Sequence, residues 1–443
     1  MKFRELLSRL DGKGELIHVK KKVSREYEMA AVIKAFGEKP IIFENVEGSK
    51  YKAVAGLCAS RELFAGALGT TKEKLIFKMT KAMDSSVEPP IYSNGTAPCQ
   101  EVVEDAVGLD SLPILRHFES DGGRYIPSAV AIINDPDTGH NACYHRLMQI
   151  GKDRFAARLV EKRQTDTSLK KMLAQGKDLE IAFCIGNSSA VMLAASMSHA
   201  SGVNEIAIAN ALDETPVVKC ETKNILVPAD CEIVLEGRIT AELADEGPFV
   251  DLTETNDIIR KQPVIVIDKI TRRKDAIYQT LLPGLSEHKL LMGMPREPTM
   301  FKEVSKACEC TNVALTLGGS CWSHGVVQIR KKSNDEPAKA IEAAFRGHGS
   351  MKQVIVVDED IDITNPLEVE WAVATRFRAD KRLKIFENQP ASSLDPMADK
   401  PPGQKATVAK MGLDATIPLD DPARPAKKFK KVAYRQVQAK DYL

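Results

Sequence analysis

Residues 231–253 read CEIVLEGRITAELADEGPFVDLT, an apolar β-prone run followed by an acidic stretch around a Gly-Pro-Phe turn. The run 231–235 predicts a strand, and Gly247-Pro248 predicts the turn after it. The acids of this stretch are Glu236, Glu242, Asp245, Glu246 and Asp251. Apolar neighbours desolvate a carboxylate, which raises its pKa and lets it carry a proton near neutral pH. A proton-transferring pair, Glu246 and Asp251, is therefore one interpretation; a solvated acidic turn, with the other three acids on its outer side, is the alternative.

Short β-prone runs continue on both sides of this stretch, from Val102 to about Leu282. Helical patterns interrupt them only at 167–175, near 188–198 and at 205–212. Many short strands with few helices are typical of a barrel-like β domain. The central part of the chain is therefore predicted to be a β-barrel-like domain.

The flanking parts alternate strand and helix. Roughly the first 90 residues do so, with Ser24 as the predicted N-cap of a helix over 24–37, and a proline-rich segment follows them. Residues 290–357 return to the same alternation, and 391–431 predict a loop-dominated tail. The predicted fold class is α/β (α+β). Its domains are an N-terminal α/β domain (1–97), a central β domain (98–285) and a C-terminal α/β domain with an extended tail (286–443).

Length and composition limit the class of protein. The 443 residues are too many for one hydrophobic core and predict two or three domains. Lys+Arg number 62 and Asp+Glu 61, so a net charge of +1 gives no global attraction to nucleic acid or to a membrane. Hydrophobic residues make up 43% and aromatic residues 5%, which suits aliphatic packing and argues against base stacking. No apolar run has the ~18 to 20 residues of a membrane span, and the start lacks the apolar core of a signal peptide, so we expect a cytoplasmic protein.

Nine scattered cysteines, an odd number, are expected to be reduced core thiols. Cys308 and Cys310 are closely spaced, but no second such pair is available to complete a zinc site.

Residues 141–163, NACYHRLMQIGKDRFAARLVEKR, predict two alternating strands joined by a turn at 151–153. Of the cations in this segment, four are candidates for one cluster: Arg146, Arg158, Lys162 and Arg163. Guanidinium groups bind phosphate and carboxylate bidentately, so the hairpin is either an anion clamp or a solvated basic surface.

Other polar residues are weaker candidates. Asn141 and Glu205 are oxygen donors of the kind that magnesium and manganese prefer, although a glutamate at a helix start is more often a charge that complements the helix dipole. His145 alternates with Arg146 and is predicted to be a core or surface histidine. His117, His288 and His324 are candidates only because they lie in predicted loops. No dinucleotide fingerprint, Walker A loop, nucleophile elbow or H-E-x-x-H motif is present.

Several motifs in combination resemble the UbiD family of decarboxylases, from the first helix to the tail. They are LPILRHFESDGGRYIP (112–127), N-x-x-x-x-R (141–146), AASM (194–197), GVNE (202–205), VKCET (218–222), EGPFVD (246–251) and KMGLDAT (410–416). The resemblance implies that the central domain is a split β-barrel that binds prenylated FMN, a divalent manganese ion (or magnesium) and often potassium.

The resemblance also assigns roles to residues of this chain. Asn141 and Glu205 match the family's metal ligands. Arg146, Glu246 and Asp251 match its Glu-Arg-acid network, in which Asp251 protonates the carbon left after carbon dioxide departs. The implied cofactor-binding residues are Tyr144, His145, Arg146, Arg158, Ser196 and Met197. The chain departs from the pattern at 161–164, which lacks the family's metal-binding histidine; Glu161 or water could replace it, or the cations at 162 and 163 could neutralise the phosphate.

The chain is similar above all to an archaeal branch of the family that decarboxylates trans-anhydromevalonate 5-phosphate to isopentenyl phosphate. The extra cations at 162 and 163, the SSLDP segment (392–396) and the tail motif carry this comparison. Decarboxylation or carboxylation of an aromatic or polyprenyl hydroxybenzoate acid is the alternative substrate class. A flavin reductase or flavin carrier is the alternative of another class. The implied partners are a small-molecule substrate, a flavin prenyltransferase that supplies the cofactor, and further copies of the chain in a dimer or hexamer, with no nucleic acid or membrane.

Overall fold

The computed structural model describes residues 1–197, 202–401, 404–419, 421–432 and 437–438, and Ser198 of the helix predicted near 188–198 lies outside them. The chain divides into two compact units. Unit 1 comprises Met1–Thr299 with Ser320–Trp322, and unit 2 comprises Met300–Gly319 with Ser323–Leu443. No helix in the described part of the chain is long and apolar enough to span a membrane.

The helices are α1 (Phe3–Gly12), α2 (Glu28–Ala35), α3 (Arg61–Ala67), α4 (Leu75–Asp84), α5 (Gln164–Ala174), α6 (Ser189–Ala194), α7 (Glu205–Leu212), α8 (Ser286–Gly293), α9 (Glu297–Ser305), α10 (Glu336–Gly347), α11 (Pro366–Arg376) and α12 (Ala379–Arg382). The strands are β1 (Ile17–Val19), β2 (Ile41–Phe43), β3 (Lys52–Ala55), β4 (Val102–Val103), β5 (Tyr125–Ile126), β6 (Val130–Asp135), β7 (Gly139–Tyr144), β8 (Leu147–Gln149), β9 (Arg154–Ala157), β10 (Leu179–Ile185), β11 (Val217–Lys219), β12 (Leu226–Pro228), β13 (Ile233–Glu246), β14 (Phe249–Val250), β15 (Asn256–Asp257), β16 (Arg260–Arg272), β17 (Ile277–Gln279), β18 (Cys310–Leu315), β19 (His324–Ile329), β20 (Gln353–Asp358), β21 (Leu383–Pro390) and β22 (Thr407–Asp414).

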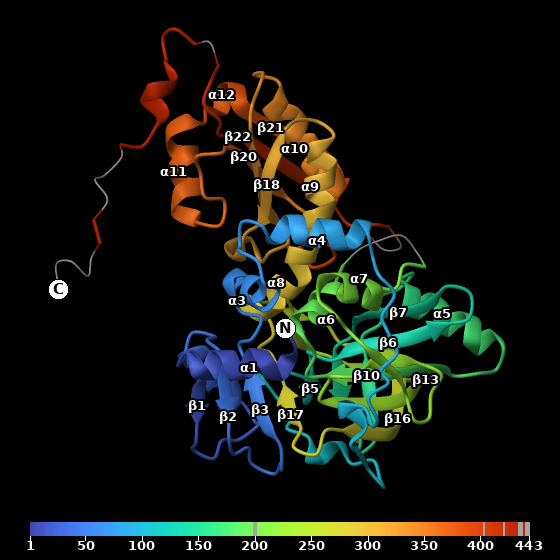
Figure 1. Cartoon of the computed structure of the whole chain (residues 1–443). Helices are drawn as coiled ribbons and strands as arrows, with labels where there is room; N and C mark the ends of the chain where they lie inside the picture. Colours follow the sequence, from blue (N-terminus) through green and yellow to red (C-terminus); the bar gives the residue numbers. More distant parts are fainter. Residues whose placement is uncertain (198–201, 402–403, 420, 433–436, 439–443) are drawn as a thin grey trace. The chain divides into compact units, whose positions relative to one another are not determined.

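Unit 1 begins with a four-stranded sheet in the order β1-β2-β3-β17, covered on one face by α1 (Figure 1). Side chains alternate across its strands. Ile42 of β2 and Val54 of β3 pack against α1, whereas Ile41 and Ala53 face the larger core on the other side. Both faces are therefore buried, which explains why these short strands are almost continuously apolar.

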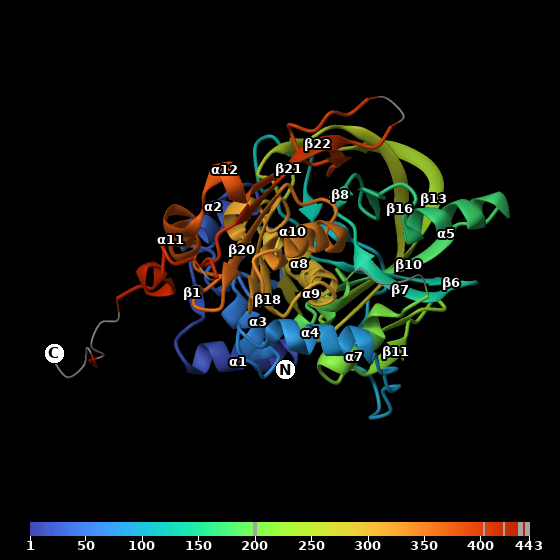
Figure 2. The same cartoon turned by 90° about the horizontal axis from the view of Figure 1, so that it is seen from above.

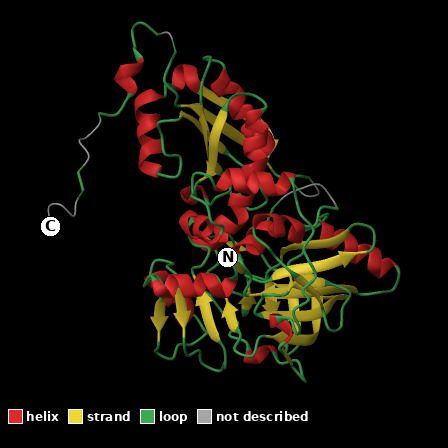
Figure 3. Cartoon of the chain, in the orientation of Figure 1, coloured by secondary structure: helices red, strands yellow, loops and turns green. Residues whose placement is uncertain are grey.

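The larger element of unit 1 is a nine-stranded sheet in the order β5-β8-β9-β16-β13-β10-β6-β7, with β4 paired to β16. Its two long strands, β13 and β16, run side by side as curved ribbons (Figure 2). Alternate apolar residues of β10 and β13, such as Phe183 and Leu235, enter one core. Among the described residues the strand path stays open between β5 and β7, so the predicted β domain is present as a strongly curved sheet (Figure 3).

Unit 2 is a five-stranded sheet in the order β18-β19-β20-β22-β21. The strands β19, β20 and β22 are parallel. Residues of α11 pack on one face in the cluster that contains Val357 and Val369, and Ile341 of α10 lies against Gly412 on β22. The α/β expectation for this region is confirmed.

Three local predictions were wrong. The segment 141–150 is split into β7 and β8, with His145 and Arg146 in the break. The second helix begins at Glu28, because Ser24 donates its backbone N–H to the Glu28 carboxylate at 2.8 Å and stays outside the helix. The predicted tail contains β22, which pairs with β20 and β21 although its sequence mixes polar and apolar residues.

Truncation of the core aromatic Phe183 tests the packing of the nine-stranded sheet. Phe183 is fully buried on β10, opposite Leu235 of β13 and Ala131 of β6. We expect Phe183→Ala to lower the free energy of unfolding by about 3–5 kcal/mol, because it removes apolar contacts and leaves a cavity. Denaturant titration measures the loss. Phe36→Ala, at a side chain that is 46% exposed, is the matched control and should cost far less.

Candidate active site

Arg146 lies at the centre of a buried cluster of charges in unit 1. It occupies the break between β7 and β8, where its backbone carbonyl accepts a hydrogen bond from the Arg158 N–H at 3.2 Å. Its side chain is 9% exposed. Burial works against its charge, but the ion pair with Glu246 outweighs burial and raises the pKa of Arg146 above its ordinary value. The guanidinium is therefore a fixed cation.

Glu246, the last residue of β13, is the main partner of Arg146. Arg146 donates from Nε to Glu246 Oε1 and from Nη2 to Glu246 Oε2, both at 2.9 Å. The Glu246 side chain is fully buried, and the Tyr125 hydroxyl donates to it at 3.1 Å. The Phe249 ring stacks under the guanidinium, 4.8 Å from its carbon atom. Three donors therefore satisfy the buried Glu246 carboxylate.

Two further acids reach Arg146 from the hairpin of β14 and β15. Asp251 accepts from Arg146 Nη1 at 3.2 Å, and its other oxygen accepts from the Leu252 N–H at 2.7 Å. Asp257 accepts from Arg146 Nη2 at 2.9 Å and from Arg260 Nη1 at 2.6 Å. Burial tends to raise the pKa of Asp257, but the two arginines lower it to about 2. The predicted trio of Arg146, Glu246 and Asp251 is thus together in space, and Asp257 and Arg260 extend it.

The three other acids of the opening stretch differ from one another. Glu242 and Asp245 are exposed, as predicted, and pair with Arg154 and Lys261. Glu236 was predicted to be solvated, which is wrong: it is fully buried and accepts from the Glu221 and Thr222 N–H groups at 2.9 and 2.7 Å. Its role is to tie the 221–222 loop to β13.

Asn141 and Glu205, 64 positions apart in sequence, meet in the interior. Asn141 on β7 donates from Nδ2 to Glu205 Oε1 at 2.7 Å, and the Ala142 N–H donates to Glu205 Oε2 at 2.7 Å. Both side chains are buried, and Glu205 is the first residue of α7. Two neighbouring oxygen-bearing side chains suit a hard divalent cation. The described residues contain no group of three His, Cys, Asp or Glu side chains placed to hold a metal, so other ligands would have to complete such a site.

Tyr144 and His145 make their hydrogen bonds within the protein. The Tyr144 hydroxyl donates to the Met192 carbonyl at 3.0 Å. The His145 ring lies 3.2 Å from the Arg158 carbonyl and 3.1 Å from the Thr165 hydroxyl, and burial lowers its pKa to about 4. His145 is a neutral core histidine, although it lies in the break between β7 and β8 and not on the alternating strand that was predicted.

The four candidate cations of the hairpin, Arg146, Arg158, Lys162 and Arg163, do not converge on one another. Arg146 turns into the carboxylate cluster, whereas Arg158 donates to the Leu159 carbonyl at 2.5 Å and pairs with Glu161 at 3.4 Å. Lys162 and Arg163 are exposed at the start of α5. The hairpin as a whole is therefore not one clamp.

Ser196 and Met197 follow α6 and are buried. Among the described residues, which exclude 198–201, the Ser196 hydroxyl has no hydrogen-bond partner. A buried hydroxyl without a partner is rare in folded proteins and indicates a group or water that completes it.

Arg296 was not predicted from the sequence, and His288 was predicted only as a candidate site residue in a loop. His288 lies on α8, where its Nδ1 accepts from the Gly284 N–H at 3.0 Å; burial lowers its pKa, and nearby Asp251 opposes that change. Arg296 stacks on Trp322, and burial together with the charge of Arg163 lowers its pKa to about 10. No spacing motif marks Arg296, because its neighbours come from distant segments.

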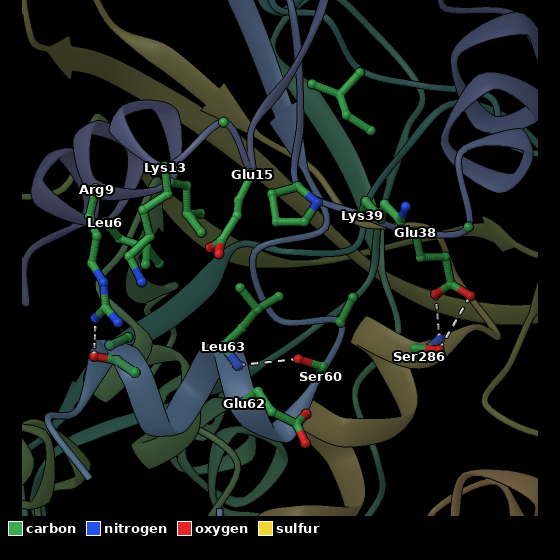
Figure 4. A pocket seen from close by; sticks show the side chains of 18 residues that line it. Leu6, Arg9, Lys13, Glu15, Glu38, Lys39, Ser60, Glu62, Leu63 and Ser286 are labelled. Carbon is green, nitrogen blue, oxygen red and sulfur yellow. Dashed lines mark hydrogen bonds between the residues drawn. The ribbon is translucent and has the colours of Figure 1, made fainter. Parts of the chain in front are cut away.

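Two cavities in unit 1 lie outside the charge cluster. One of about 710 Å³ lies between α1 and α3, with Arg9, Lys13 and Glu15 on its wall (Figure 4). It contains none of the predicted site residues. The other, of about 630 Å³, is lined by His117, Val250 and Glu254 and so touches the hairpin that carries Asp251. The His117 ring is buried there, which lowers its pKa to about 3.

Three family models cover almost the whole chain. They are the N-terminal, Rift-related and C-terminal domains of 3-octaprenyl-4-hydroxybenzoate carboxy-lyase, matched at residues 7–83, 91–286 and 289–415. The chain therefore belongs to the UbiD family of carboxy-lyases.

Individual relatives extend along the full length. The chain is 40% identical over 417 residues to an anhydromevalonate phosphate decarboxylase of Methanosarcina mazei, covering 94% of this chain and 96% of the relative. It is 31% identical over 452 residues to a phenolic acid decarboxylase of Sedimentibacter hydroxybenzoicus, covering 95% and 92%. Among solved structures, the UbiD-class enzyme HmfF from Pelotomaculum thermopropionicum in complex with FMN matches with a TM-score of 0.94 and 37% identity over 100% of both chains. An evolved dimeric form of HmfF in complex with prenylated FMN (prFMN) matches with a TM-score of 0.89 and 36% identity, again over 100% of both chains.

Gly122 tests how the turn after Glu246 is positioned. The Gly122 N–H donates to the Pro248 carbonyl at 2.9 Å, and a Cβ at Gly122 would lie 2.0 Å from the Gly247 carbonyl oxygen. We expect Gly122→Ala to displace this turn and to lower the free energy of unfolding by about 1–3 kcal/mol, since overpacking cannot relax against backbone. Denaturant titration measures it. Gly108→Ala is the control, because a Cβ there meets nothing within 4 Å; equal losses in both variants would contradict the explanation.

Proposed function

We propose that the protein is a non-oxidative decarboxylase that uses prenylated FMN to convert trans-anhydromevalonate 5-phosphate into isopentenyl phosphate and carbon dioxide. The observation that carries the proposal is the buried Arg146, held by Glu246 and in contact with the hairpin acid Asp251. Archaeal relatives named as anhydromevalonate phosphate decarboxylases, 39–40% identical over at least 90% of this chain, support the substrate. The phenolic acid decarboxylase is more distant, at 31% identity.

The residues near Ser196 fit a bound flavin. The buried Ser196 hydroxyl lacks a partner in the described part of the chain, and a ligand group would supply one. Tyr144, His145, Arg158 and Met197 complete the proposed cofactor-binding set, and in this set Tyr144 and His145 support the wall through the protein contacts they already make. When bound, the prenylated flavin supplies a sink for the electron pair that carbon dioxide leaves behind.

The donor set of Asn141 and Glu205 fits a divalent cation, manganese or magnesium, shared with the cofactor phosphate. Each Glu205 oxygen accepts from an N–H donor, and a carboxylate oxygen has a second lone pair that can meet an ion. The family's histidine is absent from 161–164, and phosphate oxygens or water would complete the coordination. Potassium near Ser196 is part of the same proposal.

The protein groups divide the acid chemistry between them. Arg146 binds and orients the substrate carboxylate, since it is a permanent cation whose N–H donors lie in one plane and match a carboxylate. Glu246 remains an anion and keeps the guanidinium in place. Asp251 has one arginine contact, at the longest distance of the three acids, and carries the proton that passes from its carboxyl oxygen to carbon. Phe249 walls the cluster with an apolar ring, which weakens solvation of the leaving carboxylate.

The alternatives make different use of these groups. A flavin reductase or flavin carrier has no function for a proton-carrying Asp251 beside a carboxylate-binding arginine. Decarboxylation of an aromatic acid uses the same cluster but needs no partner for a phosphate. Arg296 is buried and the charge of Arg163 acts on it, so an anionic group in the substrate would relieve the repulsion between these two cations.

The proposed domains, location and assembly follow from the relationship to the UbiD family. We propose three domains, 1–97, 98–285 and 286–443, in line with the three family models. We further propose a cytoplasmic homo-oligomer, a dimer or hexamer, that receives its cofactor from a flavin prenyltransferase. The evolved dimeric HmfF supports a self-associating family member.

Asp251→Asn tests the proton-transfer role. We expect turnover of trans-anhydromevalonate 5-phosphate to fall by at least about 100-fold, since general acid catalysis contributes about 10²–10⁴. Bound cofactor, measured by visible absorption and mass spectrometry, should remain. The control Asp245→Asn, at an exposed acid of the same segment, should keep full activity. Carbon dioxide release from a phenolic acid but not from the phosphate ester would replace the proposed substrate, and an active Asp251→Asn would contradict the role.

Glu205→Gln tests the metal site. The substitution keeps the shape but removes the charge that a divalent ion requires. We expect at least about tenfold less manganese per protein, measured by elemental mass spectrometry on cofactor-loaded protein, with less retained cofactor. Glu180→Gln, at an exposed acid on β10, should bind metal like the wild type. Unchanged metal content in Glu205→Gln would remove Glu205 from the ligand set.

A further inference from the structure

The charge cluster contains more groups than a carboxylate-binding arginine and two acids require. Two arginines, Arg146 and Arg260, face three carboxylates, Glu246, Asp251 and Asp257. With every group ionised these ion pairs carry one negative charge in excess, and the two further charges near Arg146, Asp121 and Arg116, are of opposite sign to each other. A single proton on one acid makes the cluster neutral, and buried charge is far less costly when it is balanced.

The hydrogen bonds decide which acid takes that proton. Glu246 accepts two bonds from Arg146 and one from Tyr125. Asp257 accepts from Arg146, from Arg260 and from the Ile258 N–H at 2.9 Å. Asp251 accepts one arginine bond, at 3.2 Å, and one backbone bond. Asp251 is therefore the least stabilised as an anion.

We propose that Asp257 and Arg260 are positioning residues that set the pH at which Asp251 loses its proton. Asp257 adds a negative charge on the far side of Arg146 and so weakens the attraction between Arg146 and ionised Asp251. Arg260 in turn neutralises part of the Asp257 charge. The pair acts on Asp251 through the shared guanidinium, and this inference rests on the proposed function of Asp251.

Other groups also face Asp251, and they constrain how the experiment is designed. His288 on α8 lies near it, and its lowered pKa leaves it uncharged at neutral pH. Lys289 on the same helix is paired with Glu254 of the hairpin and contributes little net charge. Neither group changes in the variants below, so any change in the titration of Asp251 comes from the Asp257–Arg260 pair.

The two substitutions Asp257→Asn and Arg260→Gln have opposite predicted effects. Loss of the Asp257 charge leaves Arg146 freer to stabilise ionised Asp251, so the proton leaves at lower pH. Loss of the Arg260 charge leaves Asp257 fully negative beside Arg146, so Asp251 keeps its proton to higher pH. A structural role alone would move both variants in the same direction or in neither.

The main experiment measures the pH dependence of kcat/KM for the cofactor-loaded enzyme, whose alkaline limb reports the free enzyme's acid. We expect that limb to move down by roughly 0.5–1 pH unit in Asp257→Asn. In Arg260→Gln it should move up by less, because the Arg260 side chain is 29% exposed and screened by solvent. A shift of one unit changes the rate about tenfold at a fixed pH on that limb.

Asp245 and Lys261 provide matched controls. They pair across β13 and β16 one residue away from Glu246 and Arg260, and their side chains are 63% and 64% exposed. Asp245→Asn removes a negative charge and Lys261→Gln removes a positive charge on the same two paired strands. Both should leave the alkaline limb of the kcat/KM profile within about 0.2 pH units of wild type, because exposed charges are screened.

A direct titration separates this inference from the proposed function. Infrared spectra of protein labelled with ¹³C-aspartate, with Asp251→Asn to assign the band, report when Asp251 loses its proton, without any substrate. Opposite shifts in the two variants support the proposal even if the wild-type enzyme fails to release carbon dioxide from the phosphate ester, a failure that would remove the proposed substrate alone. Shifts of the same sign, or none, in variants with wild-type thermal stability would overturn it.

Discussion

The buried ion pair between Arg146 and Glu246 is the constraint on which the rest of the site depends. Placing a carboxylate and a guanidinium away from water costs several kcal/mol per ion, and the pair is tolerated because its geometry is bidentate and its remaining bonds are satisfied. Glu246 has Tyr125 as a third donor, and Arg146 has the Phe249 ring beneath it. Removal of one partner would leave the other charge buried alone, which costs about 3–5 kcal/mol in comparable cases. The pair therefore joins the end of β13 to the break between β7 and β8.

That junction determines where the hairpin lies. β13 ends at Glu246, and the chain then turns so closely over Gly122 that no side chain fits between the two backbones. Phe249 pairs with Asp257 across β14 and β15, which brings Asp257 and Asp251 to the same guanidinium. Each acid is placed by backbone pairing and not by its own side chain. The position of Asp251 thus follows from strand register and from one glycine contact.

The strand pattern of unit 1 was largely predictable because its strands are short apolar, β-prone runs. Ile41, Ile42, Ala53 and Val54 are all buried, on the two faces of the first sheet, and β16 contains a buried apolar run at 264–267 in the second. The break at His145 and Arg146 was not predictable, because both residues fit a strand and only the ion pair with Glu246 pulls Arg146 out. The tail strand β22 was missed for a related reason: Lys410 is buried there and donates to the Gly349 carbonyl at 2.6 Å, a partner that local sequence does not reveal.

The site was predictable to the extent that its motifs lie in single segments. The pair Glu246 and Asp251 stands within six residues of sequence, and the resemblance to a family named Arg146 as its partner. Asp257 and Arg260 lie outside those motifs, and their connection to Arg146 exists only in three dimensions. Asn141 and Glu205 were predictable only in part. Neither residue marks a site by itself in the sequence, and the hydrogen bond between these residues, 64 positions apart, appears only in the fold.

The acids of residues 231–253 differ in the hydrogen-bond donors that reach their carboxylates. Glu242 and Asp245 face solvent and pair with Arg154 and Lys261. Glu236 and Glu246 are fully buried, but each accepts three hydrogen bonds from N–H or O–H groups, which favours the anion. Asp251 is half-buried, accepts two, and shares its arginine with two other carboxylates. A proton donor must lose its proton during turnover and recover it from water, so it needs weak stabilisation as an anion and partial access to solvent, and within this stretch only Asp251 has both.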